Sequence, residues 1–439
     1  MIEKKKYGLA VVDMGCRVNQ VEGEKLRLQG REQGWRLVST PGEADVVVVN
    51  TCAVTAESER QARQAIRRLI REHPEVRVVV TGCYAQRDAA ALEAMPGVAA
   101  VVPMAGKDRL LEDLAGAKPD PLPDGLPAPP VSTRTRHFLK VQDGCDHRCT
   151  YCVIPALRGA ARSVSPEEVV AMAREARAQG NRELVLTGID LGSYGRDIGT
   201  GLAFLVSELL RSSPELERLR LSSIDPLDID AELAALLAGE ERLMPHLHLS
   251  IQSGSDRVRK RMARRGGGRE VIEKLRELTE RRPDLVLGGD FIVGFPTESE
   301  ADFDATLELV RESGLCLLHV FRYSPRPGTP AARIPPRFQV SGDIQVERSA
   351  RLRAVGRAAL LQRLRQRLGS TDTLLVEERI QGRLLGKTPG FLPVSVADPD
   401  LRDRRGQIVG VRLSSVDSAE EGWLGEVTEL STELSTACG

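Results

Sequence analysis

Residues 143–152 read Asp-Gly-Cys-Asp-His-Arg-Cys-Thr-Tyr-Cys and place Cys145, Cys149 and Cys152 in a Cys-x3-Cys-x2-Cys pattern. A saturated iron–sulfur site needs four thiolates, so a cluster held by these three cysteines keeps one iron open. An open metal position can bind a substrate or cofactor, whereas a closed tetrahedral site normally serves structure or electron transfer. The spacing therefore predicts a cluster that takes part in chemistry.

Two other readings of this cysteine trio stay open. Structural zinc could take His147 or a distant residue as its fourth ligand, although zinc sites usually show paired Cys-x2-Cys knuckles or Cys/His pairs. Burial as small inert hydrophobes is disfavoured, because charged and polar residues lie between the cysteines. The spacing closely resembles that of the radical S-adenosylmethionine (SAM) enzymes. In that family the open iron binds the amino and carboxylate groups of SAM, and an electron from the cluster cleaves SAM to a 5′-deoxyadenosyl radical.

The composition is that of a globular protein with several domains. The chain has 439 residues, 41% of them hydrophobic, which exceeds the size at which one core keeps growing. Sixty-two basic residues balance sixty-two acidic ones, so a nucleic-acid surface would need local patches. We find no run of eighteen apolar residues and no signal-peptide pattern, and we expect a cytoplasmic protein without membrane contact. The eight cysteines are expected to be reduced and not paired in disulfides.

Three further cysteines, Cys16, Cys52 and Cys83, each follow a predicted strand by a few residues. Strand patterns alternate with helical patterns here, at residues 7–12, 20–33, 45–49, 57–72 and 76–80. Consecutive strand–helix–strand units favour a parallel sheet, and ligands collect at the carboxyl edge of such a sheet. We therefore expect the three thiols to converge at one edge, where they can hold a second three-cysteine cluster. The alternative is three unrelated cysteines.

Two incomplete clusters in one chain resemble the arrangement of the methylthiotransferases, and the resemblance spans almost the whole chain. These enzymes join such an N-terminal domain to a radical SAM domain and a small C-terminal domain. Residues 15–20, which read Gly-Cys-Arg-Val-Asn-Gln, are most similar to the branch that acts on threonylcarbamoyladenosine in tRNA. Residues 222–226 and 386–389 also resemble that branch. Sister branches act on isopentenyladenosine in tRNA and on a ribosomal-protein aspartate.

The middle of the chain predicts a parallel, barrel-like sheet. Strand patterns alternate with helical ones at residues 137–141, 183–186, 218–221, 246–251, 287–293 and 316–321. The resemblance implies a partial six-stranded α/β barrel over residues 135–340, and such barrels place chemistry at the carboxyl ends of their strands. Candidate SAM contacts at these ends are Gly188, Asp190, Ser223, Asp225, Gln252, Ser253 and the turn 294–296. Ordinary turn chemistry is the alternative for each of them.

Some positions depart from the family pattern. Ala156 stands where relatives usually carry tyrosine, Asp190 stands where this branch often has histidine, and the glycines at 266–268 replace a more structured segment.

The remaining histidines and cysteines of the chain are expected to be structural. We expect His246, His248 and His319 to be core or rim histidines, because no carboxylate or cysteine with ligand spacing lies near them in the sequence. Cys316 is expected in the core, and Cys438 in a polar tail.

The C-terminal part predicts an RNA-binding module. An arginine-rich helix covers residues 345–369, where too few acidic neighbours are present to neutralise Arg348, Arg351, Arg353, Arg357, Arg363, Arg365 and Arg367. Phosphate contact and a solvated helix are both open, and residues 257–265 form a second basic cluster. Short strands at 373–377, 383–385, 392–396, 408–413 and 422–427 predict a small antiparallel barrel that resembles the TRAM domain. Phe391 and Trp423 are candidates for sparse base stacking.

The predicted fold is α/β: an N-terminal open parallel domain (1–115), a linker (116–134), a partial (β/α)6 radical SAM barrel (135–340), a connecting helix (341–370), a TRAM barrel (371–430) and a tail (431–439). The resemblance implies two [4Fe-4S] clusters and SAM as cofactors. It also implies methylthiolation of C2 of N6-threonylcarbamoyladenosine at position 37 of tRNA, with a reductase or flavodoxin-type electron donor, a sulfur donor and no DNA partner. The non-catalytic alternative is an RNA-binding iron–sulfur redox sensor.

Overall fold

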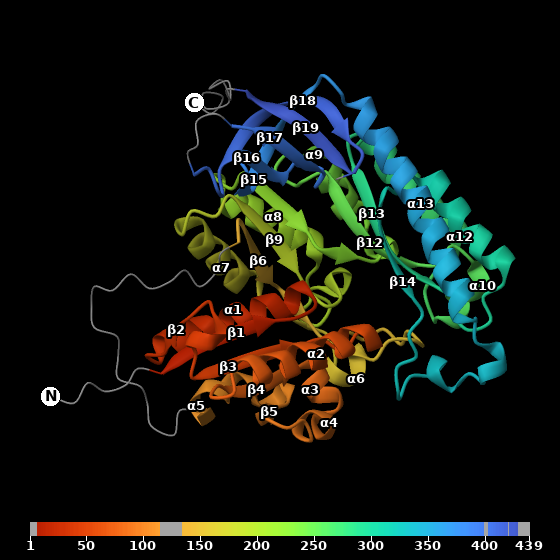
Figure 1. The fold of residues 1–439 in the computed structure, drawn as a ribbon. Helices are drawn as coiled ribbons and strands as arrows, with labels where there is room; N and C mark the ends of the chain where they lie inside the picture. The colour runs from red at the N-terminus through yellow and green to blue at the C-terminus, as the bar shows by residue number, and fades with distance from the viewer. Residues whose placement is uncertain (1–6, 115–133, 399–402, 420, 429–439) are drawn as a thin grey trace. The chain divides into compact units, whose positions relative to one another are not determined.

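A computed structural model describes residues 7–114, 134–398, 403–419 and 421–428. Contacts divide the chain into two compact units (Figure 1). The first unit comprises residues 1–133 with 144–160 and 324–332, and the second comprises the rest. Nearly all of the predicted linker 116–134, the tail 431–439 and Cys438 lie outside the described residues. The predicted domain borders stay predictions.

The first unit is built on a parallel five-stranded sheet with the order β2-β1-β3-β4-β5. The strands are β1 (Gly8–Asp13), β2 (Arg36–Leu37), β3 (Val46–Thr51), β4 (Arg77–Gly82) and β5 (Val98–Val102). The helices are α1 (Arg17–Glu32), α2 (Ala56–Glu72), α3 (Cys83–Arg87), α4 (Ala89–Glu93), α5 (Leu110–Leu114) and α6 (Ile154–Arg158). The three strand predictions are confirmed, whereas β2 and β5 were missed.

Both faces of this sheet are covered, which explains its run of valines. Val46 and Val48 pack with Leu26 of α1 on one face. Val47 and Val49 pack with Ile66 of α2 on the other. A strand buried on both faces reads as a continuous apolar run, so the sequence pattern already favoured a parallel sheet between helices.

The second unit contains the six predicted barrel strands, each within one residue of its expected ends. They are β6 (Arg136–Lys140), β9 (Glu183–Thr187), β10 (Arg218–Leu221), β12 (His246–Gln252), β13 (Val286–Val293) and β14 (Leu317–Arg322). Short strands β7 (Gln142–Asp143), β8 (Arg162–Ser163) and β11 (Ser223–Ile224) accompany them. All pairs are parallel except β7 with β8.

The barrel strands form two sheets instead of the single sheet we expected, with the orders β10-β9-β6 and β11-β12-β13-β14. The break lies at Ser222, between β10 and β11, which follow each other directly in the chain. The backbone N–H of Ser222 donates to Leu186 in β9, whereas Ser223 pairs with His248 in β12. One continuous segment therefore joins both sheets.

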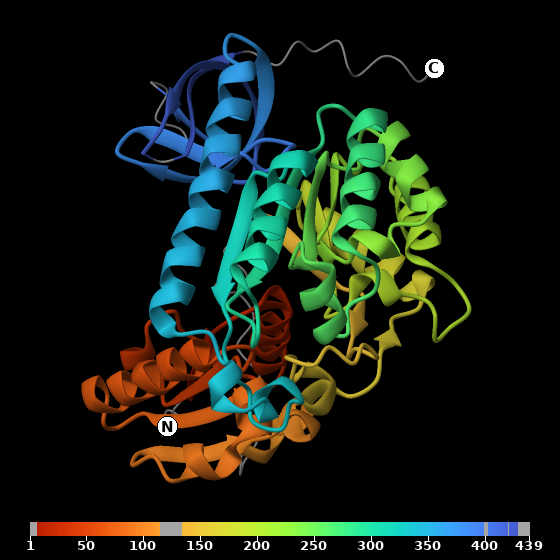
Figure 2. The ribbon, with the colours of Figure 1, turned by 90° about the vertical axis from the view of Figure 1, so that its right-hand side faces the viewer.

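Helices flank these two sheets (Figure 2). They are α7 (Pro166–Ala178), α8 (Leu202–Ser212), α9 (Ala231–Gly239), α10 (Asp256–Arg261), α11 (Gly268–Arg281), α12 (Glu300–Ser313) and α13 (Gly342–Gln366). Helix α13 packs on β14, where a Cβ on Gly356 would lie 2.6 Å from Leu318. None of the helices in the described ranges combines the length and apolar character needed to cross a bilayer.

The last strands close a five-stranded barrel in the order β15-β16-β17-β19-β18, consistent with a TRAM-like domain. They are β15 (Thr371–Ile380), β16 (Arg383–Lys387), β17 (Pro393–Ala397), β18 (Ile408–Asp417) and β19 (Gly422–Thr428). The pair β17–β19 is parallel, and the other pairs are antiparallel as expected.

This small barrel packs against the amino ends of β6, β9 and β10. Glu183 is completely buried there and pairs with Arg136, Arg218 and Arg220. Burial alone would raise the pKa of Glu183, but Arg220 and Arg136 outweigh it and hold the pKa at about 2. Arg218 also donates to Thr373 of β15 at 2.7 Å. The carboxyl ends of the strands, where we expect chemistry, are thereby left clear of the small barrel.

The arginine-rich helix is less cationic than its sequence suggests. Arg348 and Arg351 pair with Glu300, Arg357 pairs with Glu421, and Arg367 pairs with Asp372. The expectation that acidic neighbours are too few was wrong for these four arginines, because most of their partners come from other elements. Phosphate contact stays a prediction for α13.

Two exposed arginines of the second basic cluster are paired with carboxylates, and one stacking candidate is buried. Arg257 pairs with Asp302, and Arg265 pairs with Asp228. Trp423 is only 1% exposed and donates to the carbonyl of Leu364 at 2.9 Å. Trp423 is therefore a core residue of the small barrel and not a stacking platform for bases.

Candidate functional site: two cysteine trios

The cysteines Cys16, Cys52 and Cys83 lie at the carboxyl ends of three adjacent strands, β1, β3 and β4. Cys16 is the residue before α1, Cys52 directly follows β3, and Cys83 is the first residue of α3. Each thiol is close enough to another to affect its pKa. The structure thus brings these three predicted site residues together at one edge of the sheet.

Glycines permit the close approach of the segments that carry these cysteines. Gly15 has φ +95°, and a Cβ there would lie 2.3 Å from Cβ and 2.9 Å from Sγ of Cys52. Gly82 has φ +96°, and its Cβ would lie 2.4 Å from the carbonyl oxygen of Thr51. Only glycine takes this conformation freely and leaves that space. Asn19 ties the segments further, donating to the carbonyls of Met14 and Thr51 at 2.9 and 3.0 Å.

These thiols need positive charge nearby if they are to act as ligands. Burial raises the pKa of Cys52 and Cys83, whereas a metal ligand must be a thiolate. At Cys83, the charge and hydrogen bond of Arg158 oppose this rise. Three unpaired cysteines with a guanidinium beside them form a donor set that suits an iron–sulfur cluster.

Arg158 belongs to a buried network of charged side chains. Its guanidinium donates to Glu22 at 2.8 Å and to the Asn19 amide oxygen at 3.0 Å. Glu22 also accepts from Lys107 at 2.5 Å, and Lys107 donates to Asn50 at 2.9 Å. Burial lowers the pKa of Lys107, and Glu22 opposes that shift. Arg158 and Lys107 therefore share one carboxylate, that of Glu22, beside the trio.

Cys145, Cys149 and Cys152 lie in a loop that belongs to the same unit as the first trio. Gly144 starts the loop with φ +71°, where a Cβ would lie 1.9 Å from the carbonyl oxygen of Ala160. The backbone N–H of Cys145 donates to Gly159 at 3.1 Å, which closes the loop on itself. All three cysteines are half-buried and free of disulfides. Three half-buried thiols on one short loop form a donor set that suits an iron–sulfur cluster.

The segment after this loop joins the two trios. Val153 and Leu157 pack into the core that also contains Cys83 and Tyr84. Arg158 is the last residue of α6, six positions after Cys152. One short helix thus carries the contact of Arg158 with Cys83 and follows directly from the second trio.

The predicted SAM contacts lie after β9 and at the junction of β10 and β11, in the second unit. The N–H of Asp190 donates to Oε1 of Gln142 at 2.8 Å, and a Cβ on Gly188 would lie 2.8 Å from the same atom. The Ser223 hydroxyl lies 3.1 Å from that of Ser250. Asp225 pairs with Arg264 at 2.9 Å. Their role as cofactor contacts stays a prediction.

The two predicted contacts at the end of β12, Gln252 and Ser253, differ in backbone conformation and burial. Gln252 ends β12 with φ +73°, an uncommon conformation for a residue with a side chain. Ser253 is completely buried, and its hydroxyl accepts from the N–H of Ser255 at 3.2 Å and lies 3.4 Å from that of Thr306. The Ser253 side chain is therefore engaged in holding the turn.

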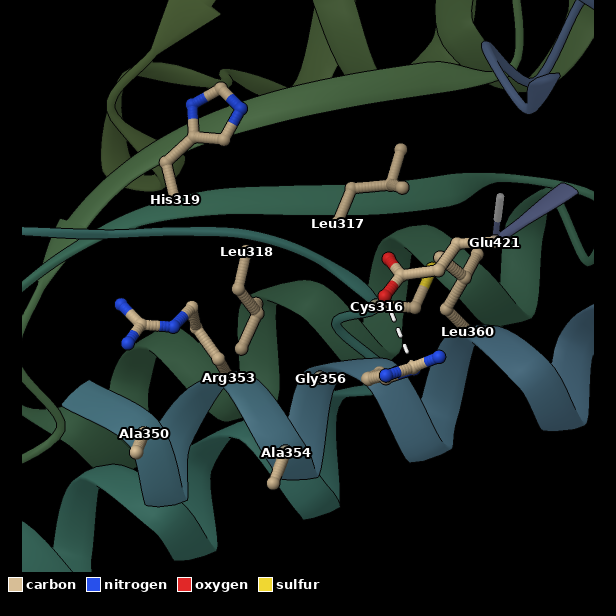
Figure 3. Close-up of a pocket in the computed structure, with 11 residues that line it drawn as sticks. Cys316, Leu317, Leu318, His319, Ala350, Arg353, Ala354, Gly356, Leu360 and Glu421 are labelled. Atoms are coloured by element: carbon tan, nitrogen blue, oxygen red, sulfur yellow. Dashed lines mark ion pairs between the residues drawn. The ribbon is translucent and has the colours of Figure 1, made fainter. Parts of the chain in front are cut away.

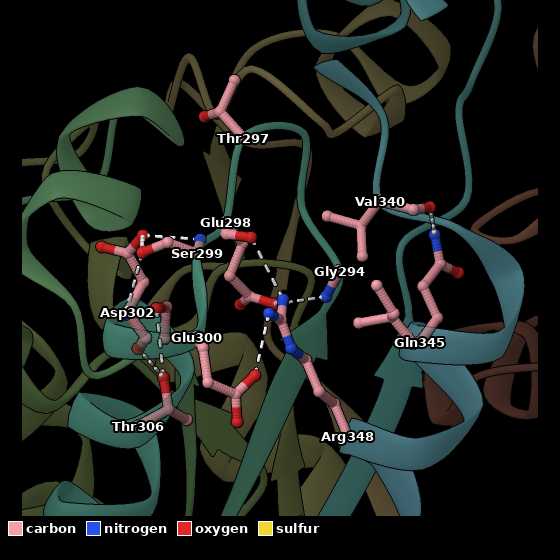
Figure 4. A network of polar contacts seen from close by, with 12 residues as sticks. Gly294, Thr297, Glu298, Ser299, Glu300, Asp302, Thr306, Val340, Gln345 and Arg348 are labelled. Carbon is pink, nitrogen blue, oxygen red and sulfur yellow. Dashed lines mark hydrogen bonds and ion pairs between the residues drawn. The ribbon is translucent and has the colours of Figure 1, made fainter. Parts of the chain in front are cut away.

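The turn after β13, which contains the predicted rim residues 294–296, is held by a buried carboxylate (Figure 4). Glu298 accepts from the N–H of Gly294 at 2.7 Å and from Arg348 of α13 at 2.7 Å. Burial raises the pKa of Glu298, and these two donors oppose the shift. The carboxylate fixes the turn to the long helix.

The structure gives the three barrel histidines different surroundings. His246 stacks on Phe391 with ring centroids 4.9 Å apart, so it is the structural histidine that we expected. His248 and His319 both contact Asp290, at 2.9 and 3.3 Å. The expectation that no carboxylate partner lies nearby was wrong, because Asp290 comes from the neighbouring strand β13 and not from a nearby sequence position.

The residues that sequence reasoning missed are Arg158, Glu22, Lys107 and Asp290. The available signal was weak: Asp290 interrupts an apolar strand pattern and Arg158 follows a cysteine trio closely, but neither position shows its partner.

Two family models match successive parts of the chain. Residues 139–310 match the Radical SAM superfamily, and residues 8–103 match the uncharacterized protein family UPF0004. The chain is 37% identical to the threonylcarbamoyladenosine tRNA methylthiotransferase MtaB of Rickettsia prowazekii, over 94% of this chain and 96% of that protein. It is 35% identical to MtaB of Bacillus subtilis, over 91% and 92% of the two chains.

The chain belongs to this methylthiotransferase family. The predicted resemblance is thereby confirmed. Among solved structures, it is similar to the radical SAM methyltransferase TsrM from Kitasatospora setae, with a TM-score of 0.55 and 16% identity. That match covers 74% of this chain and 77% of TsrM and shows the fold alone.

Proposed function

We propose that the protein replaces the C2 hydrogen of N6-threonylcarbamoyladenosine at position 37 of tRNA with a methylthio group. The observation that carries this proposal is the presence of two separate cysteine trios in one unit of a chain that is 37% identical to MtaB over nearly its full length. Removing an unactivated aromatic hydrogen is beyond any side-chain base at neutral pH, which accounts for a radical cofactor.

Each trio has its own task in this proposal. Cys145, Cys149 and Cys152 would hold one [4Fe-4S] cluster, and Cys16, Cys52 and Cys83 would hold the other. When bound, the cluster on Cys145, Cys149 and Cys152 would supply the electron that cleaves SAM, and the cluster on Cys16, Cys52 and Cys83 would supply the sulfur that a further SAM methylates. The chain itself positions the two sites: Gly15 and Gly82 allow the first trio to converge, and Arg158 places a positive charge beside Cys83.

The proposed partners follow from the same chemistry. The TRAM-like barrel and exposed arginines of α13 would contact the tRNA backbone. A reductase or flavodoxin-type protein would deliver electrons, and a separate donor would replace the consumed sulfur. A cytoplasmic location is proposed because the substrate is tRNA.

The proposal is tested by nucleoside mass spectrometry. Cluster-reconstituted protein is incubated anaerobically with SAM, reductant and bulk tRNA that lacks all methylthio groups. We expect a methylthio group on threonylcarbamoyladenosine alone. A product on isopentenyladenosine would assign the protein to that sister activity, and SAM cleavage without any nucleoside product would direct the search to ribosomal protein.

Loss of the Arg158 guanidinium is expected to weaken the first trio as a metal site. The charge beside Cys83 is lost in Arg158→Gln. The variant is made in a protein whose Cys145, Cys149 and Cys152 are all replaced by alanine, so that only the Cys16, Cys52 and Cys83 site can hold iron. The iron that remains after treatment with a chelator should fall about 10-fold or more, as when a residue that supports a metal ligand is lost. Breaking the buried ion pair should also lower the free energy of unfolding by roughly 3 kcal/mol.

Arg87→Gln is the matched control for this prediction. Arg87 pairs with buried Glu59, and Glu59 still pairs with Arg326 when Arg87 is replaced. In the same way, Glu22 still pairs with Lys107 when Arg158 is replaced. This variant should lose stability but retain iron as the background protein does. Equal iron loss in both variants would show that Arg158 acts through stability alone.

A further inference from the structure

A cluster of two histidines and one aspartate lies on three adjacent strands of the second unit. His248 of β12 donates to Asp290 of β13 at 2.9 Å, and Nδ1 of His319 in β14 lies 3.3 Å from the same Oδ1 atom. The two imidazole centroids are 4.5 Å apart. Asp290 and His319 are direct partners in the strand register, so the rigid sheet fixes their pairing.

The cluster occupies the face of the sheet that does not pack against helices. Neighbouring residues Leu249 and Phe291 lie in the hydrophobic core, and alternate residues of a strand point to opposite faces. His248 is therefore on the same face as its register partner Ser223, one of the predicted SAM contacts. Figure 3 shows His319 and Leu318 extending from opposite sides of β14.

The exposure of the three side chains changes stepwise across the cluster. The His248 side chain is 11% exposed, that of Asp290 24%, and that of His319 64%. Gly288 leaves room for the innermost imidazole, because a Cβ there would lie 2.9 Å from Nδ1 of His248. The less exposed His248 and Asp290 thus support His319, which lies at the accessible end of the cluster.

Asp290 is ionised and orients the His319 ring. Burial opposes its ionisation, but hydrogen bonds from His248 and His319 outweigh burial and hold the pKa of Asp290 at about 2. With Nδ1 turned to Asp290, the ring directs Nε2 away from the carboxylate. Within the described residues, no hydrogen bond to that Nε2 is present.

The His319 ring nitrogen that does not face Asp290 can donate a hydrogen bond to an anionic ligand when the ring is protonated. A pocket of about 520 Å³ lies between β14 and α13, on the side of β14 opposite the His319 ring, with Arg353 and Arg357 in its wall (Figure 3). An imidazolium that donates one N–H to an aspartate can donate the other to a second carboxylate.

We propose that His319, held by Asp290 and His248, recognises the carboxylate of the threonylcarbamoyl group on the substrate base. This inference rests on the proposed function and names the residue that selects the anionic substituent. His319 would donate Nε2–H to that carboxylate, and Asp290 would act as a positioning residue through the imidazole.

The test compares two anticodon stem-loops that differ only at position 37. One carries threonylcarbamoyladenosine, and the other carries its neutral carboxamide analogue. The wild-type holoenzyme should prefer the carboxylate by roughly 10- to 100-fold in kcat/KM, as expected for a hydrogen bond between charged groups. His319→Ala should lose about the same factor with the carboxylate, mainly through KM, and change little with the carboxamide.

Two further variants make the result specific. Asp290→Asn should reduce the preference as well, and in the double variant the two losses should not add, because both act through one imidazole. The His319 side chain is 64% exposed and is not needed for packing, so thermal unfolding of His319→Ala should match that of the wild type.

The outcomes separate this inference from the proposed function. If the wild type modifies neither stem-loop, the proposed function fails. If it modifies the first but His319→Ala keeps the full preference for the carboxylate, the recognition role of His319 is refuted. A bound divalent metal that is present in the wild-type holoenzyme and missing in His319→Ala would also overturn the proposal and make the cluster a metal site.

Discussion

Replacing Cys149 with alanine is expected to abolish reductive cleavage of SAM. The loop 144–160 offers three thiols to a cluster, and a site with only two of them cannot hold four irons with one open position. Loss of a residue that only supports a metal ligand typically costs roughly 10- to 100-fold in activity. Because Cys149 is itself a ligand in this proposal, we expect the rate of 5′-deoxyadenosine formation to fall by far more. The measurement is chromatographic quantification of 5′-deoxyadenosine after anaerobic reduction.

The same variant should still bind tRNA with nearly unchanged affinity. Binding of the tRNA phosphate backbone depends on basic side chains of other elements. The loop that contains Cys149 is closed by the main-chain hydrogen bond from Cys145 to Gly159, which the substitution leaves intact. Cys316→Ala is the matched cysteine control. Cys316 is buried and directs its thiol to the Leu287 carbonyl, so its loss should leave SAM cleavage intact. Unchanged cleavage in Cys149→Ala would refute the cluster assignment.

Replacing Cys52 with alanine is expected to separate SAM cleavage from sulfur insertion. Cys52 lies between Cys16 and Cys83 at the edge of the N-terminal sheet, and the second trio is intact in this variant. 5′-Deoxyadenosine should still form, whereas methylthio product should fall below detection. Nucleoside mass spectrometry and 5′-deoxyadenosine analysis on the same sample provide both readouts.

Protein stability is the control for the Cys52 prediction. Cys52 is 6% exposed, and removing its sulfur costs about 1 kcal/mol of buried contact at most, so the variant should remain folded. Thermal unfolding should confirm this before activity is compared. Methylthio product at the wild-type level would exclude the N-terminal trio from sulfur transfer.

Much of the fold could be predicted because its signals are local. The valine runs of β3 and β4 mark strands buried on both faces, and each is followed within one or two residues by a cysteine. Parallel pairing then places Cys52 and Cys83 at one edge without further information. The cysteine spacing at 145–152 is likewise a property of a single loop.

Charge pairing was harder to predict, because partners distant in the sequence show no pattern. The arginines of α13 looked unneutralised, yet Glu300 and Glu421 reach them from other elements. Trp423 looked like a stacking residue, but closure of the small barrel buries it. In each case the physical cause is packing against an element that local periodicity does not identify.

The sequence by itself determined the family, the two cysteine trios and the order of strands and helices, since these depend on residue spacing along one segment. Only the tertiary structure decided which charged groups surround the sites. Glu22 and Arg158 are 136 positions apart, and His248 and Asp290 are 42 apart. Such pairs form because burying an unpaired charge is costly, and the fold alone determines which opposite charge is within reach.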